Sequence, residues 1–382
     1  SIPFMRVVDS QMLAFNQGTT RRGSYACYMD ISHPEIEEFL FMRKSSGGDA
    51  NRKCLNLHHG INITDEFMTS VTKNIDWKLI DPHSKKVSKS INARELWRLI
   101  LETRHETGEP YLHFVDTSNK SLPETQKKLG LSIKQSNLCS EITLPTDEDR
   151  TAVCCLSSVN LAKYDEWSTS STFIPDMVRM LDNVLEHFIQ ATYDFSYDYK
   201  GEVLDMKVKE GMEGFTKAGY SAYRERSLGL GAMGFHTYLQ KLNVPFEGPI
   251  ATGQNLKMFK QIKELANKTS MELAEERGEA PDMEGTGMRN AHLLAVAPNA
   301  TSSIICGGTS PSIEPIRANV FIHKTLNGSF QVRNRQLHNL LKQKWNNSEE
   351  LQKEYDSDYQ HFKDKIWQSI SENTGSVKHL DF

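Results

Sequence analysis

Short apolar segments of strand character alternate with amphipathic helical segments along this chain, and this alternation restricts the possible folds more than any other feature. The strand-like segments lie at 24–31, 56–63, 110–115, 292–297 and 319–323. Strands separated by helices and long connections are typical of α/β folds with parallel strands. We therefore expect an α/β protein.

The helical segments carry recognisable start and stop signals. Asn92 and Glu95 form a capping-box pattern before a helix over 93–107, and Gly108 follows the end of that helix. Two further stretches with apolar residues at helical spacing lie at 176–193 and 254–277. The charged C-terminal part is expected to be mostly helical, with a break at 375–376. Because no linker or repeat interrupts the chain, we expect one domain over 1–382.

Length and charge exclude several classes of protein. The 382 residues are enough for a large core, and a net charge of −4 gives no general attraction for nucleic acid or for an anionic membrane. No apolar run reaches the roughly 20 residues of a membrane span, and the N-terminus lacks a signal-peptide pattern. We therefore expect a cytoplasmic protein that has neither nucleic acid nor membrane as a partner.

Cysteine usage fits the same compartment. The six cysteines are irregularly spaced, contain no C-x-x-C pair and form no cluster with histidines at zinc-site spacing. This pattern argues against a disulfide framework and predicts no metal site. In a reducing cytoplasm, a functional cysteine is more often catalytic than structural.

The stretch "QSNLCSEITLP" (135–145) places Asn137, Cys139 and Glu141 at alternate positions. If the segment is extended, these three side chains point to one face, since alternate residues of a strand share a face. The apolar neighbours predict that the segment is buried. Buried polar groups need partners, and a substrate is one such partner.

A second cysteine-bearing stretch, "VCCLSSVNLAKYDEW" (153–167), follows after a polar, turn-rich connection. Two neighbouring strands joined by that connection would bring Cys139 near Cys154. Adjacent thiols suggest redox chemistry, in which one cysteine acts on a substrate and another supplies electrons. The alternative is that all six cysteines are small buried hydrophobes, and we keep this interpretation for Cys27, Cys54 and Cys306.

Two further stretches are candidates for binding. "APNATSS" (297–303) has the pattern of a strand-to-helix turn whose hydroxyls and N–H groups would bind phosphate, and the alternative is ordinary helix capping by Asn299 or Thr301. "NQGTTRRGSY" (16–25) would contact a base or a phosphate, or would form a solvated turn.

These segments together resemble the large catalytic subunit of ribonucleotide reductases, class I and phage-like. "SNLCSEITLP" resembles the finger-loop motif of that family, and "VCCLSSVNLA" resembles its redox strand. "APNATSSIICGGTSPSIEPIRANV" is similar to its phosphate-binding turn and the Gly-x-Glu-Pro continuation, with Ser312 where glycine is usual. "NQGTTRRGSYACYMDISHPEIEEF" resembles the base-sensing loop and Trp-His segment, with Ser32 in place of Trp. "RSLGLGAMGFHTYL" (226–239) resembles another internal stretch of the same large subunits.

The resemblance implies the family's fold, a ten-stranded α/β barrel with a central finger loop, of which this chain would form part. It assigns Cys139 as the thiyl radical that removes the 3′ hydrogen, Glu141 as the base for the 3′ hydroxyl, and Asn137 as a hydrogen-bond partner of the substrate hydroxyls. Cys154 matches one member of the redox-active pair. The implied substrate-binding residues are Asn137, Leu138, Cys139, Ser140, Glu141, Pro298, Asn299, Ala300, Thr301 and Ser302, and the base-sensing residues are Gln17, Arg21 and Arg22.

The implied activity is the reduction of ribonucleoside diphosphates to deoxyribonucleotides for DNA synthesis. The chain itself would bind no cofactor, because a small subunit with a diiron/tyrosyl centre supplies the radical. ATP and dNTPs would act as allosteric effectors, and thioredoxin or glutaredoxin would recharge the cysteines. A carboxylate two residues from a sulfur radical is well placed to accept the neighbouring proton.

The resemblance covers only the middle of the family's large subunit. The ATP cone, the first barrel strands, the partner of Cys154, the Tyr-Tyr pair and the cysteine-bearing tail have no counterpart here, and Ser1 is expected to be a processed end or the edge of a fragment. We hypothesise a split or interrupted subunit that the remaining part of the large subunit completes. Cys155 is a poor substitute partner, since a disulfide between adjacent residues is strained.

Two other interpretations stay open. The first is an adenosylcobalamin-dependent reductase of the same superfamily, which shares the Asn-x-Cys-x-Glu motif. The second is a non-catalytic remnant that binds nucleotide or a protein. Against the remnant stands the joint presence of Asn137, Cys139, Glu141 and Cys154.

Overall fold

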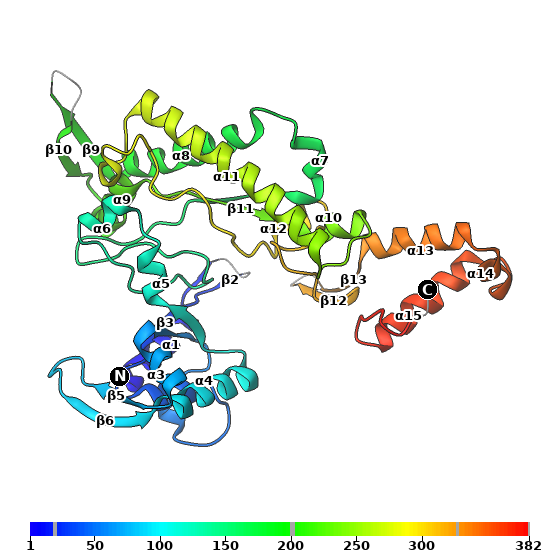
Figure 1. The fold of residues 1–382 in the computed structure, drawn as a ribbon, viewed down its shortest axis with the longest axis horizontal. Helices are drawn as coiled ribbons and strands as arrows, with labels where there is room; N and C mark the ends of the chain where they lie inside the picture. The colour runs from blue at the N-terminus through cyan, green and yellow to red at the C-terminus, as the bar shows by residue number, and fades with distance from the viewer. Residues whose placement is uncertain (18–20, 199–202, 326–327, 381–382) are drawn as a thin grey trace. The chain divides into compact units, whose positions relative to one another are not determined.

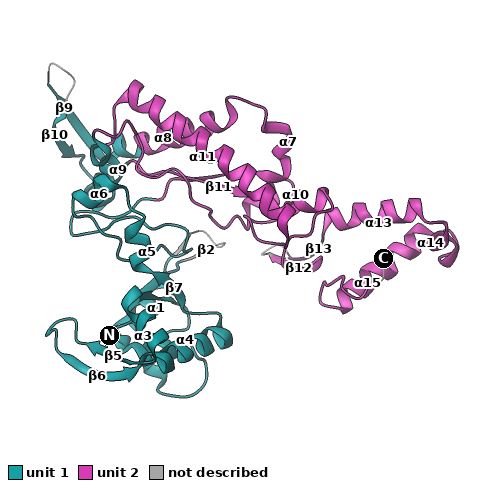
Figure 2. Ribbon diagram, in the orientation of Figure 1, with its two compact units in different colours: residues 1–153, 188–225, 281–284 teal, residues 154–187, 226–280, 285–382 magenta. Residues whose placement is uncertain are grey.

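The computed structural model describes residues 1–17, 21–198, 203–325 and 328–380. The chain groups into two compact units, coloured separately in Figure 2. Unit 1 comprises residues 1–153, 188–225 and 281–284, and unit 2 comprises residues 154–187, 226–280 and 285–382.

A three-stranded parallel sheet organises the N-terminal part of unit 1 (Figure 1). Strands β3 (Ala26–Asp30), β4 (His58–Ile63) and β7 (Tyr111–Phe114) lie in the order β3–β4–β7, and both pairings are parallel. These strands confirm the predictions at 24–31, 56–63 and 110–115. Parallel strands need crossover connections, and helices lie in both crossovers here.

Helices lie in both connections between the three strands of this sheet. Between β3 and β4 lie α2 (Ile36–Phe41) and η1 (Ala50–Arg52). Between β4 and β7 lie α3 (Asp65–Lys73), the antiparallel hairpin β5 (Asp76–Ile80) and β6 (Val87–Asn92), and α4 (Ala93–Thr107). The predicted helix over 93–107 is confirmed with its bounds. It ends at Gly108, whose left-handed conformation (φ 81°) favours glycine.

The hydrophobic core of this part of unit 1 packs helices α2, α3 and α4 with the sheet. Its fully buried members include Phe39, Ile61, Phe67, Leu96 and Ile100. Phe67 contacts the rings of Trp77 and Trp97 edge to face. The strands therefore pack against these helices, and this packing fixes the orientation of the strand side chains.

The rest of unit 1 consists of short elements drawn from separate parts of the chain. They are α1 (Ile2–Ala14), β1 (Asn16–Gln17), β2 (Arg21–Arg22), α5 (Val115–Lys120), α6 (Glu124–Lys128), β9 (Tyr193–Tyr197), β10 (Val203–Val208), η3 (Glu213–Phe215), α9 (Thr216–Glu225) and η4 (Pro281–Met283). Strands β9 and β10 form an antiparallel hairpin. Residues 131–153 have neither helix nor strand.

Unit 2 contains a second parallel pair, β8 (Leu156–Asn160) with β11 (Gly229–Met233). The predicted strand at 292–297 is wrong as an extended strand, because only an isolated bridge, Leu230 to Leu294, forms there. Gly231 allows this close approach, since a Cβ at that position would lie 2.3 Å from the Ala295 carbonyl oxygen. The helices and helical turns of this part are η2 (Leu161–Lys163), α7 (Tyr164–Trp167), α8 (Phe173–Thr192), α10 (Phe235–Lys241), α11 (Pro249–Arg277) and α12 (Ser302–Ile305).

The predictions for α8 and α11 are confirmed. Helix α8 covers the predicted 176–193 region up to Thr192, and Tyr193 begins strand β9. Its residues 173–187 belong to unit 2, and residues 188–192 belong to unit 1. Helix α11 contains the predicted 254–277 segment, and Gly278 follows its last residue.

The C-terminal part of unit 2 has its own core. The hairpin β12 (Val320–Thr325) and β13 (Gly328–Arg333) precedes helices α13 (Arg335–Asn347), α14 (Glu349–Glu354) and α15 (Tyr359–Glu372). Trp345, Phe362 and Trp367 are buried in this core. The strand predicted at 319–323 and the largely helical C-terminus are confirmed.

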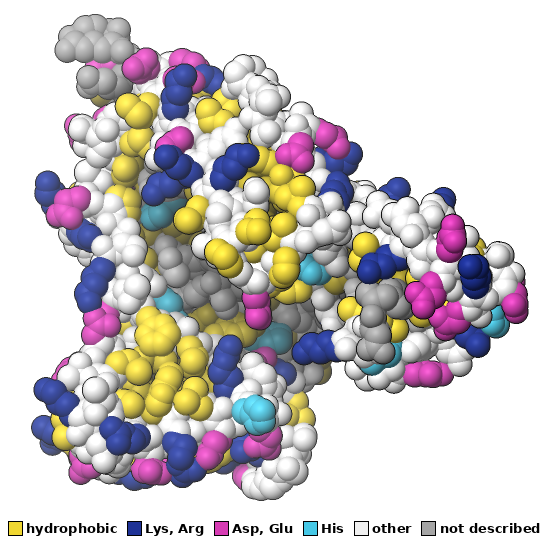
Figure 3. All heavy atoms as spheres, turned by 45° about the vertical axis from the view of Figure 1, so that its right-hand side comes forward, with side chains coloured by type: hydrophobic (Ala, Val, Ile, Leu, Met, Phe, Trp, Pro, Cys, Tyr) yellow, Lys and Arg dark blue, Asp and Glu magenta, His cyan; other side chains and the backbone are white. Residues whose placement is uncertain are grey.

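Within the part of the chain that the structure describes, no helix combines the length and apolar character that crossing a membrane requires. Figure 3 shows lysine and arginine side chains interspersed with aspartate and glutamate over the face in view.

Candidate functional site

The segment that carries Asn137, Cys139 and Glu141 is a loop with a tight turn, so the expectation of an extended strand is wrong. Residues 138–140 form the turn, and the Ser140 amide donates to the Asn137 carbonyl at 3.2 Å. Ser140 has a φ of 69°, which is a left-handed conformation. No neighbouring strand pairs with this segment among the described residues, and the backbone amides of Asn137 and Ser140 bond within the segment itself.

The turn brings the predicted amide and carboxylate together. The side-chain nitrogen of Asn137, Nδ2, donates to Glu141 Oε2 at 2.7 Å, and Asn137 Oδ1 accepts from the backbone amide of Ile142 at 3.0 Å. The backbone amide of Asn137 donates to the backbone carbonyl of Ile142 at 3.2 Å. Asn137 and Glu141 are therefore neighbours because the chain reverses, and the spacing alone would have placed them on one face of a strand.

Cys139 lies at the tip of this turn and its side chain is exposed. Partial desolvation of the sulfur and, to a smaller extent, the Glu141 carboxylate raise the pKa of the Cys139 thiol. The thiol is therefore kept protonated near neutral pH. A protonated thiol beside a carboxylate suits hydrogen-atom chemistry better than nucleophilic attack, which requires the thiolate.

Side chains from the parallel sheet and from α5 hold the loop in place. The Asn62 amide donates to the Lys134 carbonyl at 2.9 Å, and Asn119 exchanges two hydrogen bonds with the backbone of Ile133, at 2.8 and 2.9 Å. The Tyr28 hydroxyl reaches the Asn137 carbonyl at 3.4 Å. Sequence analysis missed these contacts, because the residues involved are far apart in the chain and no local pattern links them.

The second cysteine cluster belongs to unit 2. Cys154 is exposed and precedes β8, so neither Cys139 nor Cys154 lies in a strand. Cys155 is buried, and its thiol donates to the Leu181 carbonyl at 3.4 Å. Burial, and then the charge of Asp182, raise the pKa of Cys155. These contacts favour a packing role for Cys155.

The turn predicted to bind phosphate precedes the single helical turn of α12. Neither Asn299 nor Thr301 caps this turn with its side chain, because the Asn299 amide donates instead to the carbonyls of Ala232 and Ala297, at 3.3 and 2.8 Å. The backbone amides of residues 300–302 have no hydrogen-bond acceptor within the described part of the chain. Residues 300–302 are exposed. The backbone N–H groups of residues 300–302 and the hydroxyl-bearing residues Thr301 and Ser302 therefore lie at the surface.

The predicted base-sensing residues are placed only through their backbones. Gln17 in β1 pairs with Arg21 in β2, and Arg22 pairs with Asn16. Their side chains, together with residues 18–20, lie outside the described residues.

The remaining cysteines differ from one another. Cys54 is buried and Cys27 is half-buried, and burial raises the pKa of both, that of Cys54 to about 11. Cys306 is exposed. The expectation of a buried hydrophobe is therefore wrong for Cys306, which follows directly after α12 at its C-terminal end.

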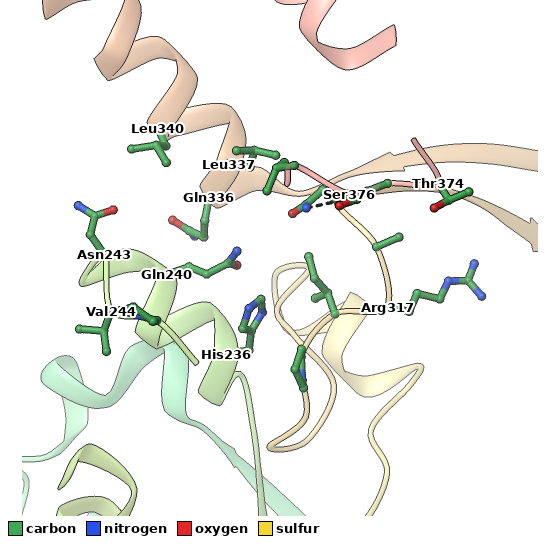
Figure 4. A pocket seen from close by; sticks show the side chains of 17 residues that line it. His236, Gln240, Asn243, Val244, Arg317, Gln336, Leu337, Leu340, Thr374 and Ser376 are labelled. Carbon is green, nitrogen blue, oxygen red and sulfur yellow. Dashed lines mark hydrogen bonds between the residues drawn. The ribbon is translucent and has the colours of Figure 1, made fainter. Parts of the chain in front are cut away.

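A cavity of about 620 Å³ lies in unit 2 between α10, α13 and the segments 315–319 and 374–377. Figure 4 shows His236 and Gln240 on one side of it and Gln336 and Leu337 on the other. None of the predicted site residues lines this cavity.

Comparison with known proteins identifies the family. The sequence profile described as the barrel domain of ribonucleotide reductase matches residues 1–286 and 281–377. The chain is 47% identical over 380 residues to a putative ribonucleoside-diphosphate reductase large subunit of Frog virus 3 (isolate Goorha), covering 100% of this chain and 61% of that relative. It is 42% identical over 434 residues to the ribonucleoside-diphosphate reductase large subunit of Invertebrate iridescent virus 3, covering 100% and 64%.

A solved structure agrees with these matches. The alpha subunit of the class Id ribonucleotide reductase of Actinobacillus ureae superposes with a TM-score of 0.76 at 31% identity, covering 99% of this chain and 60% of that chain. This chain therefore belongs to the ribonucleotide reductase barrel-domain family, and the expected α/β fold of the ribonucleotide reductase type is confirmed. It spans 61–64% of the length of the two viral relatives.

Proposed function

We propose that this chain is the catalytic part of a ribonucleoside-diphosphate reductase large subunit, which converts ribonucleotides to deoxyribonucleotides. The observation that carries the proposal is the turn in unit 1, which presents the Cys139 thiol beside the hydrogen-bonded pair Asn137 and Glu141. Family membership supports the same function.

In the proposed reaction, a Cys139 thiyl radical takes the hydrogen atom from C3′ of the ribose, so that an S–H bond forms as the C3′–H bond breaks. Glu141 accepts the proton of the 3′ hydroxyl, and Asn137 hydrogen-bonds the sugar hydroxyls. The 2′ hydroxyl takes a proton from Cys154 or from a second thiol supplied from outside this chain, and it leaves as water as the C2′–O bond breaks. The other thiol supplies the hydrogen that forms the new C2′–H bond, and the two sulfurs, having given two electrons, become a disulfide. Glu141 returns its proton to the 3′ oxygen and Cys139 returns its hydrogen atom to C3′, which restores the thiyl radical.

Residues 298–302 are proposed to bind the substrate phosphates. Their support is the set of backbone amides at 300–302 that have no acceptor among the described residues, since backbone N–H groups bind phosphate oxygens well. The base-sensing role of Gln17, Arg21 and Arg22 stays a prediction from the sequence motif.

The proposal also names partners. A radical-generating small subunit, the remaining part of the large subunit, and thioredoxin or glutaredoxin would complete the cytoplasmic enzyme, with ATP and dNTPs as effectors. The length of the viral relatives motivates the requirement for further large-subunit sequence.

The test is ribonucleoside diphosphate reduction by this chain, combined with the remaining large-subunit parts as separate polypeptides and a radical-generating small subunit. Cys139→Ala is expected to abolish turnover, whereas Cys306→Ala, which alters another exposed thiol, is expected to retain it. Glu141→Gln is expected to lower kcat by about 100-fold or more, since it removes the base. The matched control Glu148→Gln changes an exposed carboxylate of the same loop.

Other outcomes would contradict the proposal. Turnover that survives Cys139→Ala would remove the radical from this residue. A folded chain that binds ribonucleoside diphosphate but supports no turnover in any combination would favour a non-catalytic remnant. Turnover sustained by adenosylcobalamin without a small subunit would favour the cobalamin-dependent alternative.

A further inference from the structure

Tyr28 occupies the middle of β3, next to Gly60 on the neighbouring strand β4. A Cβ atom at Gly60 would lie 2.4 Å from Cε1 of the Tyr28 ring, 2.7 Å from Cδ1 and 2.8 Å from Cζ. Real Cβ atoms do not approach other atoms so closely, and the atoms in question belong to a rigid ring. Gly60 does not adopt a positive φ. The absence of its side chain therefore serves to give the ring space.

The Tyr28 ring packs over Gly60, and its hydroxyl lies next to the turn that carries Cys139. Its hydroxyl is 3.4 Å from the Asn137 carbonyl oxygen, at the long end of hydrogen-bond distances. The same carbonyl accepts the Ser140 amide that closes the turn. Burial raises the pKa of Tyr28, and the hydroxyls of Ser140 and Ser136 partly offset this rise, so both serines lie beside the phenol.

The other side of the ring is also fixed. His113 packs against Tyr28 edge to face, with ring centroids 6.1 Å apart. The His113 ring nitrogens contact Asn62 Oδ1 and Ser118 Oγ, each at 2.9 Å. The ring is thus confined by Gly60, by His113 and by the turn itself.

We propose that Tyr28 is a positioning residue for the turn that carries Cys139, and that Gly60 provides the clearance that this position of the ring requires. The catalytic consequence rests on the proposed function of Cys139. The structural consequence, which is the placement of the thiol, can be measured without turnover.

The experiment measures site-resolved alkylation by iodoacetamide in the full chain, read by mass spectrometry over a pH series. The variants are Tyr28→Phe, which removes only the hydroxyl, Tyr28→Ala, and Gly60→Ala, which displaces the ring. Tyr25→Phe is the matched control, because Tyr25 is exposed one residue before β3. Cys306 is the internal reference, since it is exposed and lies in unit 2.

The Tyr28 variants and Gly60→Ala are expected to lower the apparent pKa of Cys139 and to raise its alkylation rate at neutral pH about threefold, because a loosened turn lets the sulfur leave its partly desolvated site. Cys306 and the Tyr25→Phe control are expected to be unchanged. If Tyr28→Ala or Gly60→Ala fails to fold, Tyr28→Phe keeps the ring and tests the hydroxyl alone.

An unchanged Cys139 profile in folded Tyr28→Phe and Tyr28→Ala would overturn the proposal. A parallel rise at Cys306 would overturn it too, since that result means general loosening. In the reconstituted enzyme, Tyr28→Phe is expected to lower kcat about tenfold with little change in KM. If the wild type shows no turnover, the proposed function fails while the alkylation data still decide the placement of Cys139.

Discussion

Burial, hydrogen bonds and neighbouring charges together set the pKa values of buried side chains in this protein. Glu109 is largely buried, and although burial alone would raise its pKa, hydrogen bonds from His59 and His58 and the charge of Arg43 lower the pKa of Glu109 to about 2. At His292, by contrast, burial is the dominant effect on the pKa. Burial lowers the pKa of His292 to about 4, from an ordinary value of 6.5.

The depressed pKa of His292 predicts a loss of stability in acid. Below the ordinary value, the unfolded chain binds more protons than the folded chain, so stability falls as the pH drops from 6.5 towards 4. The expected loss for this residue between about pH 7.5 and about pH 5 is roughly 2 kcal/mol. Urea unfolding of wild type and His292→Gln at both pH values measures it.

His292→Gln is expected to show a pH dependence that is smaller by that amount. The exposed His83 provides the control, since His83→Gln should keep the wild-type dependence. Equal pH dependence in His292→Gln and wild type would contradict the assignment.

Ser312 illustrates how one residue departs from the family pattern at a structural cost. It stands where the family usually has glycine, and the structure gives it a φ of 46°. This left-handed conformation favours glycine. The sequence marked Ser312 as unusual, and only the backbone conformation explains the glycine of the family.

At the scale of single elements, helix signals in the sequence were informative. Asn92 Oδ1 accepts from the amides of Arg94 and Glu95, at 3.0 and 3.1 Å, as expected for the N-cap residue. The reciprocal bond of a capping box does not form among the described residues, because Glu95 Oε2 accepts from Arg98 instead. Helix α8 forms as its periodicity indicates, but not all of its apolar side chains are buried, since Val184 is 55% exposed. The buried stripe is centred on Val178, Leu181 and Leu185.

Asn92→Ala is expected to destabilise the start of α4 by about 1 kcal/mol, because two backbone amides lose their acceptor. Hydrogen exchange of the amides at 93–96 should become faster, and the urea midpoint should fall. Ser88→Ala, at an exposed position of the same hairpin, is the control. Unchanged exchange at 93–96 would show that the cap contributes nothing.

At the scale of the whole molecule, unit 1 is assembled from three separate stretches of chain. Asp282, which is 1% exposed, joins them. Arg150 donates two hydrogen bonds to its carboxylate, at 2.6 and 3.1 Å, and Arg224 donates a third at 2.9 Å. One carboxylate from the third stretch thus connects an arginine from each of the other two.

Asp282→Asn is expected to cost about 3–5 kcal/mol, since it removes the buried carboxylate charge that accepts two hydrogen bonds from the buried Arg150. Equilibrium denaturation followed by hydrogen exchange in unit 1 measures the loss. Asp149→Asn removes an exposed charge next to Arg150 and should change stability by less than about 1 kcal/mol. A similarly small effect of Asp282→Asn would mean that packing alone joins the three stretches.

The sequence by itself determined the α/β class, the three parallel strands of unit 1, the long helices and the motifs that point to the family. These features follow from local periodicity and capping, which depend on residues a few positions apart. Sequence reasoning also selected Asn137, Cys139 and Glu141, but it placed them on a strand. The tertiary structure decided that they lie on a turn, which is closed by the bond from the Ser140 amide to the Asn137 carbonyl and which pairs with no strand among the described residues.

The contacts that place the turn and join unit 1 were decided by the tertiary structure alone. Tyr28 and Asn137 are 109 residues apart in the sequence, and Arg150 and Asp282 are 132 apart. No local pattern encodes such pairs, because each is formed only when separate stretches of the chain pack together.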